Sequence, residues 1–339
     1  MSKVLVTGGT GFIGSHTVVE LQNAGYEVVI IDNLSNSDIE VVDGIEKITG
    51  NRPAFYQGDV CSKTDLDKLF KEHSDIKAIV HFAADKAVGE SVEKPLMYYR
   101  NNVGGLVNLL ETMLAHNITN MVFSSSCTVY GEPEVLPVTE MSPVVKAMSP
   151  YGNTKKICEE ILQDTGKTGK LNTIALRYFN PIGAHDSSLI GELPLGVPNN
   201  LVPFITQTAI GKRKELTVFG SDYETRDGTC IRDYIHVVDL AVAHVKSVDR
   251  LLKGANFSAF ETFNVGTGNG FTVLEIINAF ENVSGEKLNY KIGDRRAGDV
   301  EAVWADTSKA NQVLGFKTER DLNNMLKTAW DWELALSKK

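Results

Sequence analysis

The sequence predicts an α/β protein in which a Rossmann-type, doubly wound parallel sheet is followed by a smaller α/β domain. A glycine-rich turn near the N-terminus lies between an apolar run and a helix-like stretch. Short apolar runs then alternate with helix-like stretches, which is the pattern of a parallel sheet covered on both faces. Beyond about residue 180 the alternation loosens into segments rich in Gly, Pro and Asn, notably 191–200.

We therefore expect one domain at 1–180 and a second at 181–339, with some segments of the second half returning to the first domain. The 339 residues, 42% hydrophobic and 23% charged, are enough for two such domains with large cores. The net charge of -9 argues against a nucleic-acid partner. The four cysteines and seven histidines show none of the spacings typical of metal sites, so no metal is expected.

The start of the chain indicates where the protein works. Its first residues lead straight into an apolar strand without a signal-like segment, and about 18 apolar residues never run together. We therefore expect a cytoplasmic protein without a membrane partner.

The glycine-rich turn predicts a dinucleotide site. A strand at 3–6 precedes Gly8, Gly11 and Gly14, a helix at 15–23 follows them, and a second strand from 27 to 31 ends at Asp32. Glycines let the backbone approach a pyrophosphate, and the helix N-terminus directs free N–H groups at its charge. Asp32 could accept hydrogen bonds from the adenine ribose and would repel a 2′-phosphate. The first domain is therefore expected to bind NAD rather than NADP.

The alternation continues through the first half. A third strand is suggested at 54–56 and 58–60, where Asp59 could meet the adenine. Further strands are expected at 77–82 and 120–123, and a long helix at 95–116. Ligands of a parallel sheet collect at the carboxyl ends of its strands, where Lys86 and Ser126 fall. Asn101 lies either on the helix surface or against the cofactor.

The stretch 124–155 carries the predicted chemistry. Tyr151 and Lys155 are four residues apart, so on a helix capped by Ser149 they share one face. A phenol ionises near pH ~10, and two nearby positive charges, the ammonium and an oxidised nicotinamide ring, would favour its phenolate. Ser126 is the hydroxyl expected to share a substrate proton with that phenolate.

The second half is expected to hold a substrate. Strands are expected at 216–219, 229–231, 262–265 and 288–291, and helices at 238–252, 272–283, 307–314 and 321–336. Arg232, Arg295 and Arg296 could grip a diphosphate, because guanidinium groups bind phosphate oxygens two at a time. A surface ion pair explains any single arginine equally well.

Seven segments resemble those of the UDP-galactose 4-epimerases, a family of extended short-chain dehydrogenases/reductases. They are 6–16, 81–91, 124–131, 149–155, 176–184, 232–239 and 295–299. The resemblance covers essentially the whole chain and implies a reversible interconversion of UDP-galactose and UDP-glucose. Tyr151 would take the C4 hydroxyl proton while hydride passes to NAD, and hydride would return to the opposite face of the 4-ketose. Lys155 would lower the phenol pKa and anchor the nicotinamide, and Ser126 would bridge the proton.

The resemblance also implies the other site residues. The dinucleotide would be bound by Gly8, Gly11, Phe12, Ile13, Gly14, Asp32, Asn33, Asn36, Asp59, Val60, Phe82, Ala83, Lys86, Asn101, Ser124, Tyr151, Lys155, Tyr178 and Pro181. The UDP-sugar would be bound, mainly in the second domain, by Lys86, Ser126, Tyr151, Asn180, Asn200, Leu201, Phe219, Arg232, Arg296, Asp299 and Val303.

Val303 departs from the family pattern, because members restricted to plain hexoses look as though they carry tyrosine there. A smaller side chain leaves room beside the sugar, so UDP-GlcNAc and UDP-GalNAc are expected as additional substrates unless neighbouring loops refill the space. The resemblance also implies a homodimer, with 97–111 and 156–163 as candidate contacts.

Two alternatives stay open at this point. One is another sugar-nucleotide epimerase or a dehydratase of the same family, although Ser125, Ser126 and Cys127 offer no acidic group for eliminating water. The other is a noncatalytic NAD-sensing regulator, which the intact Ser126, Tyr151 and Lys155 set argues against.

Overall fold

The computed structural model describes residues 2–145, 147–296 and 298–338. Ala297, within the predicted arginine segment 295–299, lies outside the described residues. No helix in the described part of the chain is long and apolar enough to cross a bilayer.

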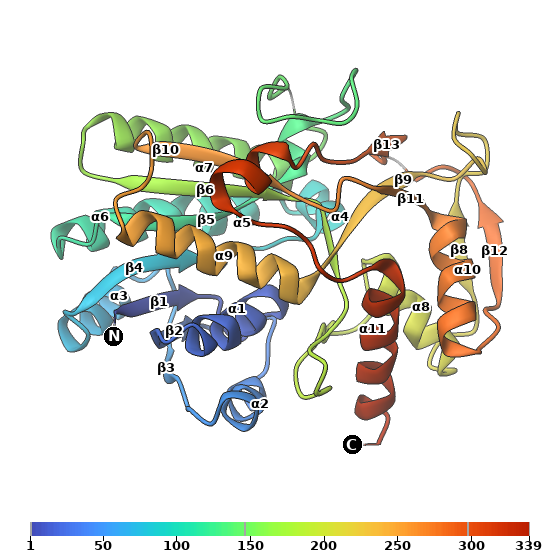
Figure 1. Ribbon diagram of the computed structural model, residues 1–339, viewed down its shortest axis with the longest axis horizontal. Helices are drawn as coiled ribbons and strands as arrows, with labels where there is room; N and C mark the ends of the chain where they lie inside the picture. The colour runs from blue at the N-terminus through green and yellow to red at the C-terminus, as the bar shows by residue number, and fades with distance from the viewer. Residues whose placement is uncertain (1, 146, 297, 339) are drawn as a thin grey trace.

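A central parallel sheet organises the molecule (Figure 1). Over the described residues it has seven strands in the order β10-β6-β5-β4-β1-β2-β3, and every neighbouring pair is parallel. The strands are β1 (Lys3–Thr7), β2 (Glu27–Asp32), β3 (Ala54–Gln57), β4 (Ile76–His81), β5 (Asn120–Ser126), β6 (Asn172–Tyr178) and β10 (Phe260–Val265). The predicted doubly wound sheet is confirmed. Its strand order reverses between β1 and β4, where ligands of such sheets bind.

Helices cover both faces of this sheet because each buries an apolar stripe against it. One face carries α1 (Phe12–Asn23), α2 (Glu40–Thr49), α9 (Val237–Leu252) and η3 (Ala310–Leu314). The other carries α3 (Lys63–Glu72), α6 (Gly105–Ala115) and α7 (Pro150–Lys167). Shorter elements lie between β4 and α7, namely α4 (Val88–Glu93), α5 (Pro95–Tyr98), η1 (Tyr99–Gly104) and η2 (Cys127–Tyr130). Three elements from beyond residue 180 thus belong to the central layer: α9 and η3 pack on the sheet, and β10 is one of its strands.

A smaller assembly lies beside the sheet, at the right of Figure 1. Its helices α8 (Leu201–Ala209), α10 (Val273–Ser284) and α11 (Leu322–Leu336) share one apolar cluster with several of its strands. These strands are β7 (Asn180–Ile182), β8 (Leu216–Phe219), β9 (Ile231–His236), β11 (Gly270–Thr272), β12 (Tyr290–Gly293) and β13 (Ala302–Val303). β9 pairs with β7, β11 and β13, and β8 pairs with β12.

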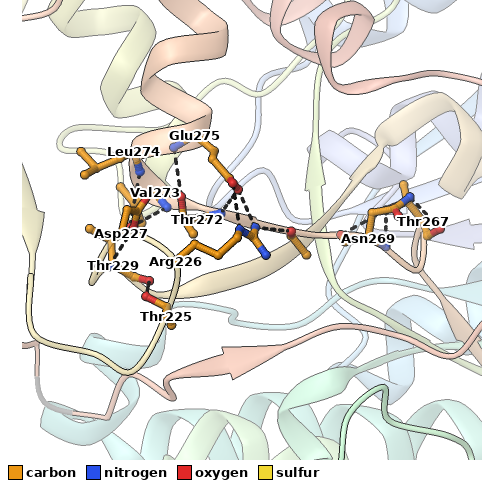
Figure 2. A network of polar contacts seen from close by, with 11 residues as sticks. Thr225, Arg226, Asp227, Thr229, Thr267, Asn269, Thr272, Val273, Leu274 and Glu275 are labelled. Atoms are coloured by element: carbon orange, nitrogen blue, oxygen red, sulfur yellow. Dashed lines mark hydrogen bonds and ion pairs between the residues drawn. The ribbon is translucent and has the colours of Figure 1, made fainter.

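The loop before β9 corrects one predicted strand. The sequence predicts a strand at 229–231, but the strand begins only at Ile231. Thr229 instead contacts the start of α10, where its Oγ1 accepts a hydrogen bond from Val273 N at 3.1 Å (Figure 2). Asp227 accepts bonds from Thr229 N and Oγ1 and from Thr272 Oγ1, which ties this loop to the helix start.

Two boundaries in the first half also differ from prediction. β3 ends at Gln57, so Gly58 to Val60 lie beyond it, where Asp59 Oδ1 accepts from Cys61 N at 2.7 Å. The predicted helix at 95–116 is continuous but contains the π-helical stretch η1. β6 was not predicted from its pattern, although its last residues belong to one of the family-like segments.

Candidate active site

The glycine turn forms a cradle that side chains would fill. Gly8 adopts a left-handed backbone with φ +71°, and a Cβ there would lie 2.8 Å from Ala83 N. A Cβ on Gly14 would lie 2.1 Å from the Gly8 carbonyl oxygen. Gly11 is the N-cap of α1, and among the described residues no side chain caps it. The first N–H groups of the helix are therefore free to bind an anion.

Asp32 stands at the end of β2, one strand away from this cradle. Its side chain is buried, and its oxygens accept bonds from Thr10 N (3.2 Å), Leu34 N (2.9 Å) and Ser37 Oγ (3.0 Å). A carboxylate offers about four acceptor positions, so one remains for a ribose hydroxyl. The cradle and Asp32 together fit a dinucleotide.

Several residues predicted around the dinucleotide also lie close together. Asn33 Nδ2 donates to Asp59 Oδ2 at 3.1 Å, and Cys61 Sγ lies 3.6 Å from Asn101 Oδ1. Val60 is buried beside them, whereas Asn36 is exposed on the loop after β2. Phe82 and Ala83 follow β4 directly, and Phe82 packs on His244 of α9.

The predicted catalytic residues converge at the carboxyl end of β5. Ser149 caps α7 by accepting from Gly152 N at 3.2 Å, as predicted. Lys155, buried on the same helix, donates from Nζ to the Ser124 carbonyl at 2.7 Å. Its Nζ lies 5.9 Å from the centre of the Tyr151 ring. The i,i+4 spacing thus places both side chains at the strand end.

Hydroxyl groups complete this centre. Ser126 Oγ accepts from Thr128 N at 3.2 Å. Burial raises the pKa of the Tyr151 phenol, and the Ser126 hydroxyl beside it acts in the opposite direction. Ser124 Oγ is hydrogen-bonded to Tyr178 OH, which β6 brings alongside β5. Pro181, predicted to lie against the nicotinamide, follows on β7.

Burial dominates the acid–base properties of this pair. Burial raises the pKa of Tyr151 to about 12, and burial lowers the pKa of Lys155 to about 8. The ammonium is therefore lost before the phenol ionises, and the fixed side chains alone hold Tyr151 as a phenol at neutral pH. A second positive charge near the phenol is needed to make it a base.

The predicted phosphate-binding arginines behave differently from one another. Arg232 of β9 lies 3.6 Å from Asp299 Oδ1, and Arg296 Nη2 donates to the same oxygen at 2.7 Å. Arg296 also lies 5.8 Å from the Phe219 ring centre, so these four residues surround one region. Arg295 instead pairs with Asp222 at 2.7 Å, outside this group.

Glu192 joins two predicted ligands that come from different halves of the chain. Its Oε1 accepts from Asn200 Nδ2 at 2.7 Å and lies 3.6 Å from Lys86 Nζ. Trp332 Nε1 donates to the Glu192 carbonyl at 2.8 Å and fixes this part of the loop. Sequence reasoning missed Glu192, because an acid in a polar loop carries no local signal. Asn180 begins β7, and Leu201 begins α8 directly after Asn200.

Val303 lies in an apolar cluster beside the predicted catalytic hydroxyls. It is buried with Tyr130, Val138 and Phe179, and Cys127 packs against the same cluster. Its strand β13 pairs with β9, which sets Val303 opposite Arg232. Within the described residues, no group of three or more His, Cys, Asp or Glu side chains could hold a metal ion.

Comparisons with known proteins agree with this geometry. Residues 5–329 match a family model described as GDP-mannose 4,6 dehydratase. The chain is 49% identical to the UDP-glucose 4-epimerase of Haemophilus influenzae, with 97% of each chain covered. A UDP-glucose 4-epimerase structure from Stenotrophomonas maltophila, with bound NAD and formylated UDP-arabinopyranose, superposes with a TM-score of 0.96 at 47% identity, covering 100% and 99% of the chains. The UDP-glucose 4-epimerase structure from Bifidobacterium longum, in complex with NAD⁺ and UDP, superposes with a TM-score of 0.95. The two sequences are 44% identical, and the match covers 98% of each chain.

A Rossmann-type sheet with a Ser–Tyr–Lys arrangement at the end of β5 defines an extended short-chain dehydrogenase/reductase. Within that class, the chain belongs to the UDP-glucose 4-epimerase family. The resemblance predicted from seven sequence segments is confirmed.

Proposed function

We propose that the chain interconverts UDP-glucose and UDP-galactose by inverting the configuration at C4 of the sugar, with NAD as its cofactor. The observation that carries this proposal is the placement of Tyr151, Lys155 and Ser126 at the carboxyl end of β5, in the sheet that also carries the glycine cradle. Membership of the family supports the same activity and cofactor. NAD, held by the cradle and Asp32, supplies the acceptor and donor of hydrogen at C4.

The side chains of the site divide the remaining work. Tyr151 takes the proton of the C4 hydroxyl and returns it when the 4-keto sugar is reduced. Ser126 relays that proton to the phenol. Lys155 is fixed by the Ser124 carbonyl, so its charge stays beside the phenol as the sugar reacts.

The substrate half of the site binds the nucleotide and leaves the sugar free to turn. Arg232 and Arg296 bind the diphosphate once their contacts with Asp299 rearrange, and Phe219 packs on the uracil. We assign these roles to residues 181–339, and we assign the dinucleotide and the catalytic side chains to residues 1–180. Glu192 holds Lys86 and Asn200 in place between the two halves.

The small side chain at Val303 supports turnover of N-acetylated UDP-sugars as well. Its cluster is apolar and compact, and a tyrosine there would have to displace Phe179 or Tyr130. Replacing Val303 with tyrosine is expected to lower turnover of UDP-GlcNAc far more than turnover of UDP-glucose. If the parent turns over UDP-GlcNAc more than about a thousandfold more slowly than UDP-glucose, Val303 does not widen the specificity.

A homodimer is also proposed. Val92 and Leu96 are exposed on α4 and α5, with Leu96 77% exposed, and Met97 and Val107 continue this apolar surface onto α6. Met97 and Val107 belong to the predicted contact 97–111, and α4 and α5 pack beside α7. Light scattering during size-exclusion chromatography tests the dimer, and Leu96→Glu should yield monomers.

The primary test is an epimerase assay on the purified chain. UDP-galactose is supplied, and the UDP-glucose formed is measured with a coupled UDP-glucose dehydrogenase. Tyr151→Phe should abolish turnover while leaving bound NAD detectable by mass spectrometry. A parent protein that binds NAD but forms no UDP-glucose would instead support a noncatalytic NAD sensor.

A further inference from the structure

A buried ion pair lies directly behind the predicted catalytic serines. Glu159 of α7 and Arg177 of β6 are only 6% and 5% exposed. Arg177 donates from Nε to Glu159 Oε1 at 2.9 Å and from Nη2 to Glu159 Oε2 at 2.5 Å. Ser125 Oγ donates to the same Oε1 at 2.5 Å, which joins the pair to β5. The pair therefore connects one helix to two strands.

The contacts extend from this pair across the sheet. Ser125, Arg177 and Asn264 are register neighbours on β5, β6 and β10, so they point to the same face. Tyr130 OH accepts from Arg177 Nη1 at 3.1 Å and donates to Asn264 Oδ1 at 2.7 Å. Asn264 Nδ2 in turn donates to the Val138 carbonyl at 2.9 Å. The network thus also holds η2 and the loop that leads to α7.

Stability alone does not account for this arrangement. Removing two charges from water costs several kcal/mol per ion, and apolar residues of similar volume often stabilise a fold as well or better. What the Glu159 and Arg177 bonds supply is a fixed geometry, because two directed bonds and a third from Ser125 leave α7 little freedom to slide along the sheet.

We infer that the Glu159–Arg177 pair positions the base helix against the strand that carries the catalytic hydroxyl, an inference that rests on the proposed function. Glu159 lies one turn beyond Lys155 and two turns beyond Tyr151, so the three share a face of α7. Its bond to Ser125 ties that face to the end of β5. The pair touches no reacting atom and acts through the residues that do.

The charge of the pair has a smaller effect on Lys155 than its geometry. Burial lowers the pKa of Lys155 to about 8, whereas Cys158 and Glu159 on the same helix raise it. His81 at the end of β4 faces the same ammonium. The pKa of His81 is lowered mainly by burial and, to a smaller extent, by the positive charge of Lys155. Arg177 neutralises much of the Glu159 charge, so the main effect of the pair is on geometry.

The test replaces the pair with apolar residues of similar size, Glu159→Leu with Arg177→Met. Its matched control is a second buried pair, Arg250 and Glu261, changed in the same way to Met and Leu. The side chains of Arg250 and Glu261 are 10% and 6% exposed, and they form a bond of 2.8 Å. The pair lies at the amino end of β10, away from the site. Both double variants should keep a cooperative thermal transition and bound NAD.

The readouts are kcat, KM and the titration of Tyr151 itself. In the Glu159/Arg177 variant, kcat should fall on the order of 10²-fold with little change in KM, because a displacement near 1 Å costs about that much. The tyrosinate absorbance of NAD-loaded protein, minus that of the Tyr151→Phe version, should show the Tyr151 pKa raised by about one unit. The Arg250/Glu261 control should change neither quantity.

A second variant keeps the inference testable if the first fails to fold. Ser125→Ala removes only the bond between the pair and β5, and it should lower kcat and raise the Tyr151 pKa in the same direction. A folded double variant, or a Ser125→Ala protein, with parental kcat and parental Tyr151 titration overturns the inference. A parent protein without epimerase activity refutes the proposed function instead, and the titration still reports the positioning.

Discussion

Removing the ammonium of Lys155 should make Tyr151 a poor base while leaving the phenol in place. In Lys155→Met the charge that lies 5.9 Å from the centre of the Tyr151 ring is lost. At an effective dielectric constant near 20, two unit charges at that separation attract by about 3 kcal/mol. This corresponds to about two pKa units for the phenol. Because burial already raises that pKa to about 12, kcat should fall on the order of 10²-fold at pH 7.

The pH dependence provides an independent check on the cause. Lys155 is charged below its lowered pKa of about 8 and neutral above it. The rate difference between parent and Lys155→Met should therefore be largest below pH 8 and narrow as the pH rises through that value. The coupled assay on NAD-loaded proteins, with kcat and KM determined from pH 6 upward, measures this difference.

A matched control separates charge from helix disruption. Lys167 lies on the last turn of α7 and forms an exposed pair with Asp164, so Lys167→Met should leave kcat unchanged. If Lys155→Met stays within about threefold of the parent in kcat, or changes only KM, the ammonium does not act on the phenol and the reasoning is refuted.

Three further predictions follow from packing, charge and burial. Gly14→Ala forces a Cβ to 2.1 Å from a backbone oxygen and should unfold the turn. A Cβ on Gly11 would lie 3.3 Å from its nearest neighbour, so Gly11→Ala should keep the parental melting temperature but retain less NAD. Glu192→Gln removes the charge beside Lys86 and should raise the KM for UDP-glucose more than it lowers kcat. Four buried histidines have pKa values of about 3 to 4, so the unfolded chain binds more protons than the folded one below pH 6.5. Stability should then fall by up to about 5 kcal/mol per pH unit below about pH 6, and His16→Gln should reduce that slope by about a quarter, measured by urea unfolding.

The local patterns of the sequence predicted most strands of the central sheet, although they did not indicate β6. Apolar runs bounded by glycine or acid correspond to β1, β2 and β4, because a strand buried on both faces needs nothing but apolar residues. β9 was misplaced because it carries Arg232, Asp233 and His236. Asp233 is fully buried, and its oxygens accept bonds from Thr267 N, Gly268 N and Ala305 N. The residues next to β9 in the sequence do not indicate those partners, so the local pattern predicted the strand at 229–231 instead.

Local sequence likewise indicated the predicted catalytic residues but not the residues that position them. Tyr151 and Lys155 could be found because their i,i+4 spacing is itself the chemical requirement.

Glu159 and Arg177 are 18 positions apart, and each alone has the sequence character of a solvated surface charge. Strand alternation could nevertheless have pointed to them, because Ser124 and Ser126 must face away from Ser125. A polar residue that faces away from the site at the end of a buried strand needs a buried partner, and only the helix and the strand packed beside it can provide one. Polar residues one position before the ends of successive parallel strands, as at Ser125, Arg177 and Asn264, are therefore the sequence signal for such a support.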